Sequence, residues 1–255
     1  MTQALVYLDE GVCRQSAEAL ALQLEEFLDP SIAVIQVDSS YLQLEAWEDR
    51  TVVLVMGGGV CSVWDERLGC AGIEKIRRYI HQGGRYIGIC AGAYFACKET
   101  RFEMGPSSIE KKRDLSFFPG KAIGPLIQTD EPLSLSAARA AKVSFNEGDF
   151  AEEGSLYYQG GCFFDMEQEV PEIEIMGRFK KLSVHKAAAV YCRVGSGGAF
   201  LCGLHPEFKW SGDLSVKADR IYAALVEKLS RHETFRQNVW KVAGRKLALP
   251  MKPKP

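Results

Sequence analysis

The segment Gly88-Ile-Cys90-Ala-Gly92 holds the residues of this 255-residue chain whose types and spacing best fit covalent chemistry. A Gly-x-Cys-x-Gly pattern between an apolar strand and a helix is typical of a nucleophile elbow, where the central residue lies in a strained turn and its neighbours must be small. A sulfur at a helix N-terminus is favoured as thiolate, and the amide of Ala91 can face a developing oxyanion. The pattern predicts that Cys90 is a nucleophile. The alternative is a buried structural cysteine in a glycine-rich turn.

A nucleophilic thiol needs a base, and His205 is the best candidate among the four histidines. It follows the apolar segment 199–204, so we expect it at the C-terminal end of a strand, where reacting groups gather in open parallel sheets. Glu207 comes after Pro206, whose restricted φ lets the carboxylate turn back towards the imidazole. A proline at the start of a helix with an acidic first turn would give the same string. The other histidines are more easily placed on the surface: His81, His185 and His232.

The elements that must position these groups alternate over the first 100 residues. Short apolar runs predict strands, and residues at helical spacing predict two helices: strands at 4–8, 33–37, 51–56 and 85–89, helices at 14–28 and about 72–82. The third strand is followed by the three glycines at 57–59. Continuous apolar strands are buried on both faces, so the sequence predicts an α/β fold with an open, mainly parallel twisted sheet and helices on both faces.

The periodicity weakens after Thr100, and Gly120 with the four prolines at 106, 119, 125 and 132 predicts an irregular central insertion. Its basic run Lys111-Lys112-Arg113 is expected to be a solvated loop, and Cys97 is expected on the helix after the elbow. Further strands and a last helix are predicted downstream: 155–158, 172–176, a hairpin of 187–194 with 199–204, and a helix at 215–230. We expect a single domain over 1–245 and a tail at 246–255 whose last five residues are frayed.

Composition and charge exclude several classes of protein. Apolar residues make up 47%, charged residues 25% and the net charge is -2, so the chain has neither a bilayer-spanning apolar run nor a positive field for nucleic acid. The eight cysteines show no Cys-x-x-Cys spacing, and the chain leads from Met1 directly into a strand-like run. The sequence therefore predicts a cytoplasmic protein that needs no metal or other cofactor.

These motifs resemble the class I glutamine amidotransferase superfamily, whose triad runs Cys, His, Glu in that order. Gly-Ile-Cys-Ala-Gly-Ala-Tyr, Tyr157-Tyr-Gln-Gly-Gly161 and Leu204-His-Pro-Glu-Phe are most similar to the N-terminal domain of biotin-protein ligases. The resemblance implies a flavodoxin-like fold with Cys90 as nucleophile, His205 as general base and Glu207 as its orienting partner. It also implies an oxyanion hole and substrate contacts: the amides of Gly58 or Gly59 with Ala91, and Tyr94, Tyr158, Gln159, Gly160 and Gly161. Without the resemblance, the three glycines would be equally well explained as the end of a strand.

One residue departs from the superfamily pattern. Glutaminases of this superfamily generally carry Gln two residues after the second elbow glycine, where this sequence has Tyr94, so glutamine is not the expected substrate. The main hypothesis is a cysteine hydrolase or amidase that forms an acyl-enzyme with a small-molecule amide or acyl substrate, alone or with a separate partner protein. The alternative is a non-catalytic regulatory module that binds a small molecule or a partner. A third hypothesis, the stress-response and peptidase branch of the same fold, is disfavoured by the His-Pro-Glu string.

Overall fold

The computed structural model describes residues 1–126, 131, 134–148, 150–180, 186–210 and 220–253. Five parallel strands form one half of its sheet in the order β2-β1-β3-β4-β13. Their bounds are Gln3–Tyr7 for β1, Ala33–Val37 for β2, Thr51–Met56 for β3, Arg85–Ile89 for β4 and Gly197–Cys202 for β13. The predicted strands at 33–37, 51–56 and 85–89 are thus confirmed. Residues 53–56 of β3 and 86–89 of β4 are buried, whereas the edge strand β2 is only partly buried.

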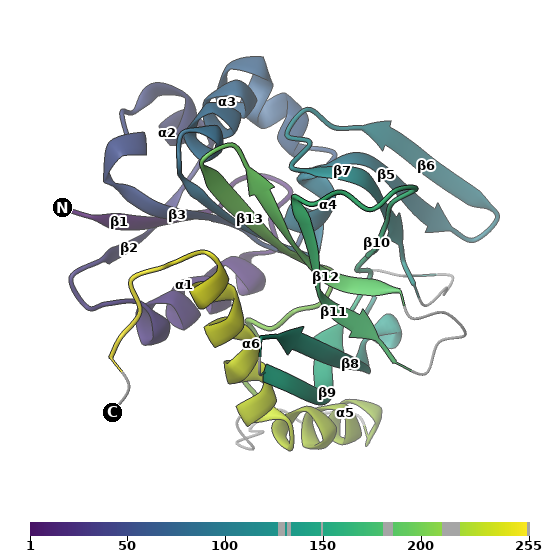
Figure 1. Ribbon diagram of the computed structural model, residues 1–255. Helices are drawn as coiled ribbons and strands as arrows, with labels where there is room; N and C mark the ends of the chain where they lie inside the picture. Colours follow the sequence, from purple (N-terminus) through teal and green to yellow (C-terminus); the bar gives the residue numbers. More distant parts are fainter. Residues whose placement is uncertain (127–130, 132–133, 149, 181–185, 211–219, 254–255) are drawn as a thin grey trace.

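Helices cover both faces of this parallel half, as Figure 1 shows. On one face lie α2 (Ser39–Leu44) and α3 (Trp64–His81), which pack with Leu54 and Met56 of β3. On the other lie α1 (Arg14–Phe27) and α6 (Glu233–Lys246), which pack with Val53 and Val55. Successive strand residues point to opposite faces, so one strand serves both cores. The α/β prediction is confirmed.

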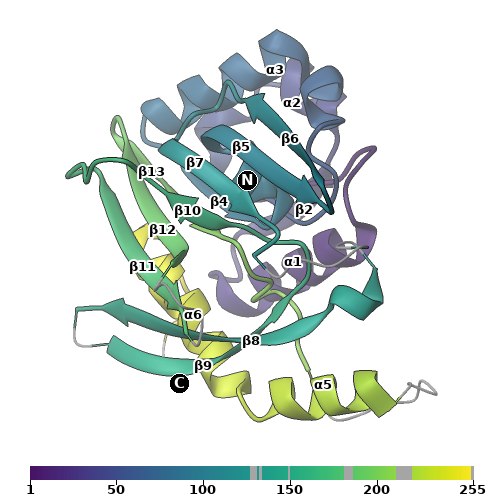
Figure 2. The ribbon, with the colours of Figure 1, turned by 90° about the vertical axis from the view of Figure 1, so that its right-hand side faces the viewer.

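Between residues 97 and 194 the chain forms further strands, both in the segment that the sequence predicts as irregular and at the predicted strands 155–158, 172–176 and 187–194. These are β5 (Cys97–Met104), β6 (Ser107–Lys112), β7 (Phe118–Gly124), β8 (Arg139–Glu147), β9 (Phe150–Tyr158), β10 (Phe163–Asp165), β11 (Ile173–Phe179) and β12 (Ala187–Val194). They extend the sheet through β12-β10-β7-β5-β6, while β11, β8 and β9 branch from β12. Figure 2 shows β5, β6 and β7 as a group near α3, and β8 and β9 beside α5 (Arg220–Ser230). The predicted hairpin of β12 and β13 is confirmed.

Two local predictions in this stretch are wrong. Cys97 is not helical, because α4 (Ala91–Phe95) ends before it and Cys97 is the first residue of β5. Lys111 and Lys112 lie in strand β6 and Arg113 is only 7% exposed, so the basic run is not a solvated loop. The guanidinium of Arg113 is held inside by the carboxylate of Asp65 on α3, which supplies the counter-charge that a buried cation requires.

Some helices begin or end at other residues than predicted. Helix α3 begins at Trp64, well before the predicted start at about residue 72, and Gly69 interrupts it at a φ of 56°. Of the predicted helix at 215–230, the part before residue 220 lies outside the described residues, as does His185. The chain after α6 packs against the protein as far as Lys252, whose amide donates to Phe27 O at 3.0 Å, so residues 251 and 252 are not frayed.

Two short 3-10 turns lie at Glu48–Arg50 and Leu135–Ala137. Among the described helices, none has both the length and the apolar composition to cross a membrane.

Candidate active site

Cys90 lies in the turn between β4 and α4 with a φ of 51° and a ψ of -105°, a conformation that non-glycine residues rarely adopt. The two glycines of the motif make this turn sterically feasible. A Cβ on Gly88 would lie 2.6 Å from Gly92 O, and a Cβ on Gly92 would overlap Met56 O. Since α4 has only five residues, a charged sulfur here would meet the amide of Ala91 rather than a long helix dipole, because the amides of Gly92, Ala93 and Tyr94 donate to backbone carbonyls. Strained backbone of this kind is often found at functional sites.

The side chains of His205 and Glu207 form a buried hydrogen-bonded pair beside this turn. Nδ1 of His205 lies 2.8 Å from Oε1 of Glu207, and the two residues are 6% and 2% exposed. Burial by itself lowers the pKa of His205, but the Glu207 carboxylate and then Cys90, including a side-chain hydrogen bond with each, raise it well above 6.5. Because Glu207 occupies Nδ1, Nε2 is the nitrogen left to exchange a proton with the Cys90 sulfur.

The backbone around His205 is fixed from several sides. Its amide donates to Tyr157 O at 2.9 Å, and its ring stacks on Phe208 with centroids 5.5 Å apart. The carbonyl of Pro206 accepts hydrogen bonds from Arg236 Nη1 and Trp240 Nε1 of α6, each at 2.8 Å. Arg236 and Trp240 do not belong to a recognisable local motif, so the sequence did not predict their role here.

Ser16 of α1 connects the carboxylate to the glycine turn after β3. Its hydroxyl donates to Glu207 Oε1 at 2.7 Å and accepts from the amide of Gly58 at 2.9 Å. Gly58 is therefore not a free oxyanion donor, which corrects one of the two alternatives drawn from the sequence. The amides of Gly59 and Ala91 donate to no group in the described part of the chain, and both residues line the cavity next to Cys90. These two amides are the available donors for an oxyanion.

The residues expected to bind substrate fall into two groups. Tyr94 and Gly160 line the cavity and are joined by a hydrogen bond of 3.2 Å from the Tyr94 hydroxyl to Gly160 O. The Tyr158 hydroxyl donates a hydrogen bond of 2.9 Å to Gly161 O, and neither residue is part of the cavity lining. Gln159 meets the site through its carbonyl, which lies 3.7 Å from the Cys90 sulfur. The segment 157–161 thus shapes the site mainly through its backbone.

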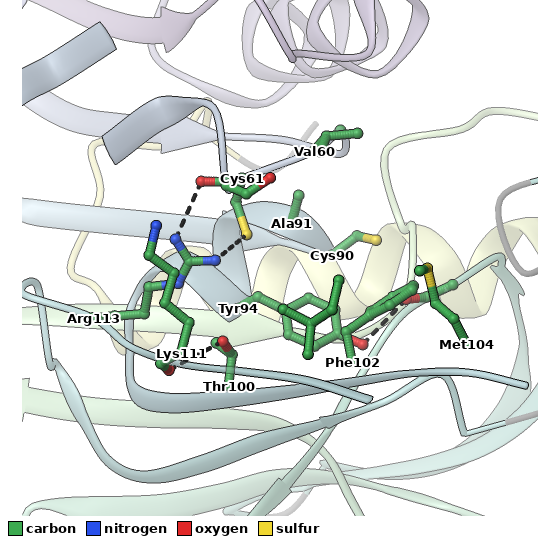
Figure 3. Close-up of a pocket in the computed structure, with 14 residues that line it drawn as sticks. Val60, Cys61, Cys90, Ala91, Tyr94, Thr100, Phe102, Met104, Lys111 and Arg113 are labelled. Carbon is green, nitrogen blue, oxygen red and sulfur yellow. Dashed lines mark hydrogen bonds between the residues drawn. The ribbon is translucent and has the colours of Figure 1, made fainter. Parts of the chain in front are cut away.

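A cavity of about 180 Å³ opens beside Cys90 (Figure 3). Its lining comes from the turn after β3, from α4 and from the β5–β6 hairpin: Gly59, Val60, Cys61, Ser62, Cys90, Ala91, Tyr94, Thr100, Phe102, Met104, Ile109, Lys111, Arg113 and Gly160. Cys61 is a second thiol in this lining, and Arg113 Nη2 lies 3.1 Å from its sulfur. Burial raises the pKa of Cys61 to about 11 although Arg113 lowers it, so Cys61 is a neutral thiol near pH 7. The described residues hold no cluster of three or more His, Cys, Asp or Glu side chains suited to a metal ion.

The class of protein follows from the fold around this site. A solved glutamine amidotransferase structure superposes with a TM-score of 0.56 over 88% of this chain and 98% of its own, at 15% identity, which establishes the shared fold. The resemblance to the class I glutamine amidotransferase superfamily is thus confirmed at the level of fold. The chain belongs to the family described as biotin-protein ligase, N terminal, whose model matches residues 2–255.

Two relatives are similar to most of this chain, and one of them is a biotin-protein ligase. A biotin-protein ligase of Schizosaccharomyces pombe is 32% identical over 216 residues, which are 82% of this chain and 34% of that ligase. An uncharacterised protein of Chlamydia muridarum is 34% identical over 212 residues, which are 82% of this chain and 81% of that protein. The match thus covers about a third of the ligase but most of the chlamydial protein.

Proposed function

We propose that this chain is a thiol-dependent amidase or acyl hydrolase that forms an acyl-enzyme on Cys90 with a small-molecule amide or acyl substrate. The observation that carries the proposal is the buried pair in which Nδ1 of His205 lies 2.8 Å from Glu207 Oε1, beside Cys90, whose charge contributes to the raised pKa of His205. A nucleophile, a base and an orienting carboxylate gathered at one buried site support acyl transfer.

The proposed reaction assigns a step to each group. The Cys90 thiolate attacks the carbonyl carbon of the substrate, a C–S bond forms, and the oxygen that gains negative charge accepts hydrogen bonds from the amides of Gly59 and Ala91. Collapse of this intermediate breaks the bond to the leaving group, which takes a proton from the His205 imidazolium. Water then attacks the thioester while His205 accepts its proton, and the acid and the Cys90 thiolate are released.

Family membership favours a second candidate, a non-catalytic module that binds a small molecule or a separate partner protein. The Tyr94 hydroxyl is bonded to Gly160 O at 3.2 Å and the side chain is buried, so the position that generally holds a substrate-binding Gln in glutaminases is instead part of the cavity wall. This arrangement supports a pocket that does not accept glutamine. It is compatible with either candidate function.

Acylation by p-nitrophenyl acetate, followed by intact-protein and peptide mass spectrometry, separates the two candidates. The hydrolase proposal expects one acetyl group per chain on Cys90, none in Cys90→Ala, and acylation of His205→Ala slowed about a hundredfold, the low end of general base catalysis. Cys61→Ala is the matched control, since it removes the other thiol of the cavity and leaves the pair of His205 and Glu207 intact. Acylation spread over several cysteines, at a rate that His205→Ala does not change, would favour the binding module.

A further inference from the structure

The cavity beside Cys90 gathers apolar side chains that protrude from the surface. Val60, Met104 and Ile109 are 46%, 44% and 55% exposed, and all three line this cavity together with Phe102 and Tyr94. Exposed apolar side chains are unremarkable when scattered singly, but a contiguous group around a concave site indicates a binding function. In Figure 3, Tyr94, Phe102 and Met104 lie on the same side of the cavity, next to Cys90.

Thr100, Lys111 and Arg113 of the lining make hydrogen bonds within the protein, although Nε of Arg113 has no hydrogen-bond partner among the described residues. Thr100 Oγ1 donates to Lys111 O at 3.2 Å, and Lys111 Nζ donates to Asp65 Oδ2 at 2.5 Å. The guanidinium of Arg113 donates to Cys61 O at 3.3 Å and to the same Asp65 carboxylate. A glutamine-like substrate would bring an ammonium and a carboxylate into this space, and burying charged groups without new partners is costly.

We infer that the substrate presents a short apolar acyl group, of the order of a butanoyl to an octanoyl chain, to this cavity. The inference rests on the proposed function. A volume of about 180 Å³ is small beside the roughly 300 to 1,000 Å³ of sites that enclose a whole drug-sized ligand, so the cavity fits one such group and leaves the remainder of the substrate outside. The carbonyl lies at the amides of Gly59 and Ala91, and the chain lies against Tyr94 and Phe102.

A series of p-nitrophenyl esters with acetyl, butanoyl, hexanoyl and octanoyl groups tests the inference. Each methylene buried in an apolar site strengthens binding about fourfold, so kcat/KM should rise at least tenfold from acetyl to hexanoyl. Met104→Lys places a charge on the exposed rim, where folding is least disturbed, and should lower the ratio of hexanoyl to acetyl kcat/KM at least fivefold. Leu44→Lys is the matched control, because Leu44 is 80% exposed and is not part of the lining, and it should leave that ratio unchanged.

Binding of hexanamide to the Cys90→Ala variant, measured by isothermal titration, separates this inference from the proposed function. Binding that Met104→Lys weakens, with no acylation by any ester, would overturn the hydrolase and leave the apolar specificity supported. Acylation of Cys90 with no dependence on chain length, and no hexanamide binding, would overturn the inference and leave the hydrolase supported.

Discussion

The hydroxyl of Ser16 donates a hydrogen bond of 2.7 Å to the carboxylate of Glu207, 191 positions away in the chain. Ser16 is fully buried, and the same oxygen accepts a hydrogen bond from the amide of Gly58. One side chain of α1 therefore connects Glu207, the proposed orienting partner of His205, with the glycine turn that is proposed to supply an oxyanion donor. We expect the proposed reaction to depend on this contact as well as on the three residues of the triad motif.

Replacement of Ser16 by Ala should slow acylation of Cys90 about tenfold, because a hydrogen bond to a charged group contributes about 1.5 to 3 kcal/mol and its loss frees Glu207 to move. The pH profile of acylation should shift as well, which a purely structural change would not cause. Ser39→Ala is the control, since Ser39 is also buried but lies beside Asp9, to which its amide donates at 2.9 Å, outside the proposed site. Equal rates and pH profiles for the two variants would show that Ser16 does not position the pair of His205 and Glu207.

The pH dependence of stability should reflect His205. Its pKa in the folded state is raised well above 6.5, so its contribution to the free energy of unfolding is complete below about pH 6.5 and is lost as the pH rises through the folded pKa. Glu207→Gln removes the main cause of the increase, and burial should then hold the imidazole pKa below 6.5.

Nitrogen-15 NMR of the imidazole and urea unfolding at several pH values test this prediction. The wild-type imidazole of His205 should lose its proton at a higher pH than the imidazole of Glu207→Gln. The difference in unfolding free energy between the two proteins should shrink as the pH rises. A common imidazole pKa in both proteins would refute the role assigned to Glu207.

Gly92→Ala should prevent the elbow from forming, because the added Cβ would overlap Met56 O. Overpacking of this kind costs roughly 1 to 3 kcal/mol, and more where backbone atoms are involved. Gly105→Ala is a useful comparison: no atom lies within 4 Å of its added Cβ, and its φ of 56° leaves only backbone strain. Urea denaturation should give a clearly larger loss of unfolding free energy for Gly92→Ala than for Gly105→Ala. Equal losses would mean that the close approach of turn and strand does not affect stability.

The sequence predicts the parallel half of the sheet and the Cys90 turn because both depend on local information. Uninterrupted apolar runs identify strands buried on both faces, and closely spaced glycines identify a tight turn. Strand β6 gave no such signal, since all its residues are exposed and its polar side chains show no apolar alternation. The contribution of this hairpin to the cavity, through Ile109 and Lys111, was therefore not predictable.

Partners distant in the sequence explain the other differences between the predictions and the structure. Arg113 is buried because Asp65 of α3 neutralises it, and Gly58 is not a free donor because Ser16 of α1 binds its amide. Neither pairing leaves a motif in a single sequence. The apolar run after Cys90 does not distinguish a one-turn α4 from a longer helix. The sequence therefore places Cys97 on a helix, although it is the first residue of β5.

The rate at which iodoacetamide modifies each cysteine near pH 7, followed by peptide mass spectrometry, tests most directly whether Cys90 is an activated nucleophile. Cys13 and Cys70 are exposed and serve as internal references, whereas Cys97 is fully buried with a pKa raised well above 9 by that burial. We expect Cys90 to react at least about ten times faster than Cys13 and Cys70, His205→Ala to remove this advantage, and Cys97→Ala to leave it unchanged. Modification of Cys90 no faster than the two exposed cysteines, with no effect of His205→Ala, would contradict the catalytic account.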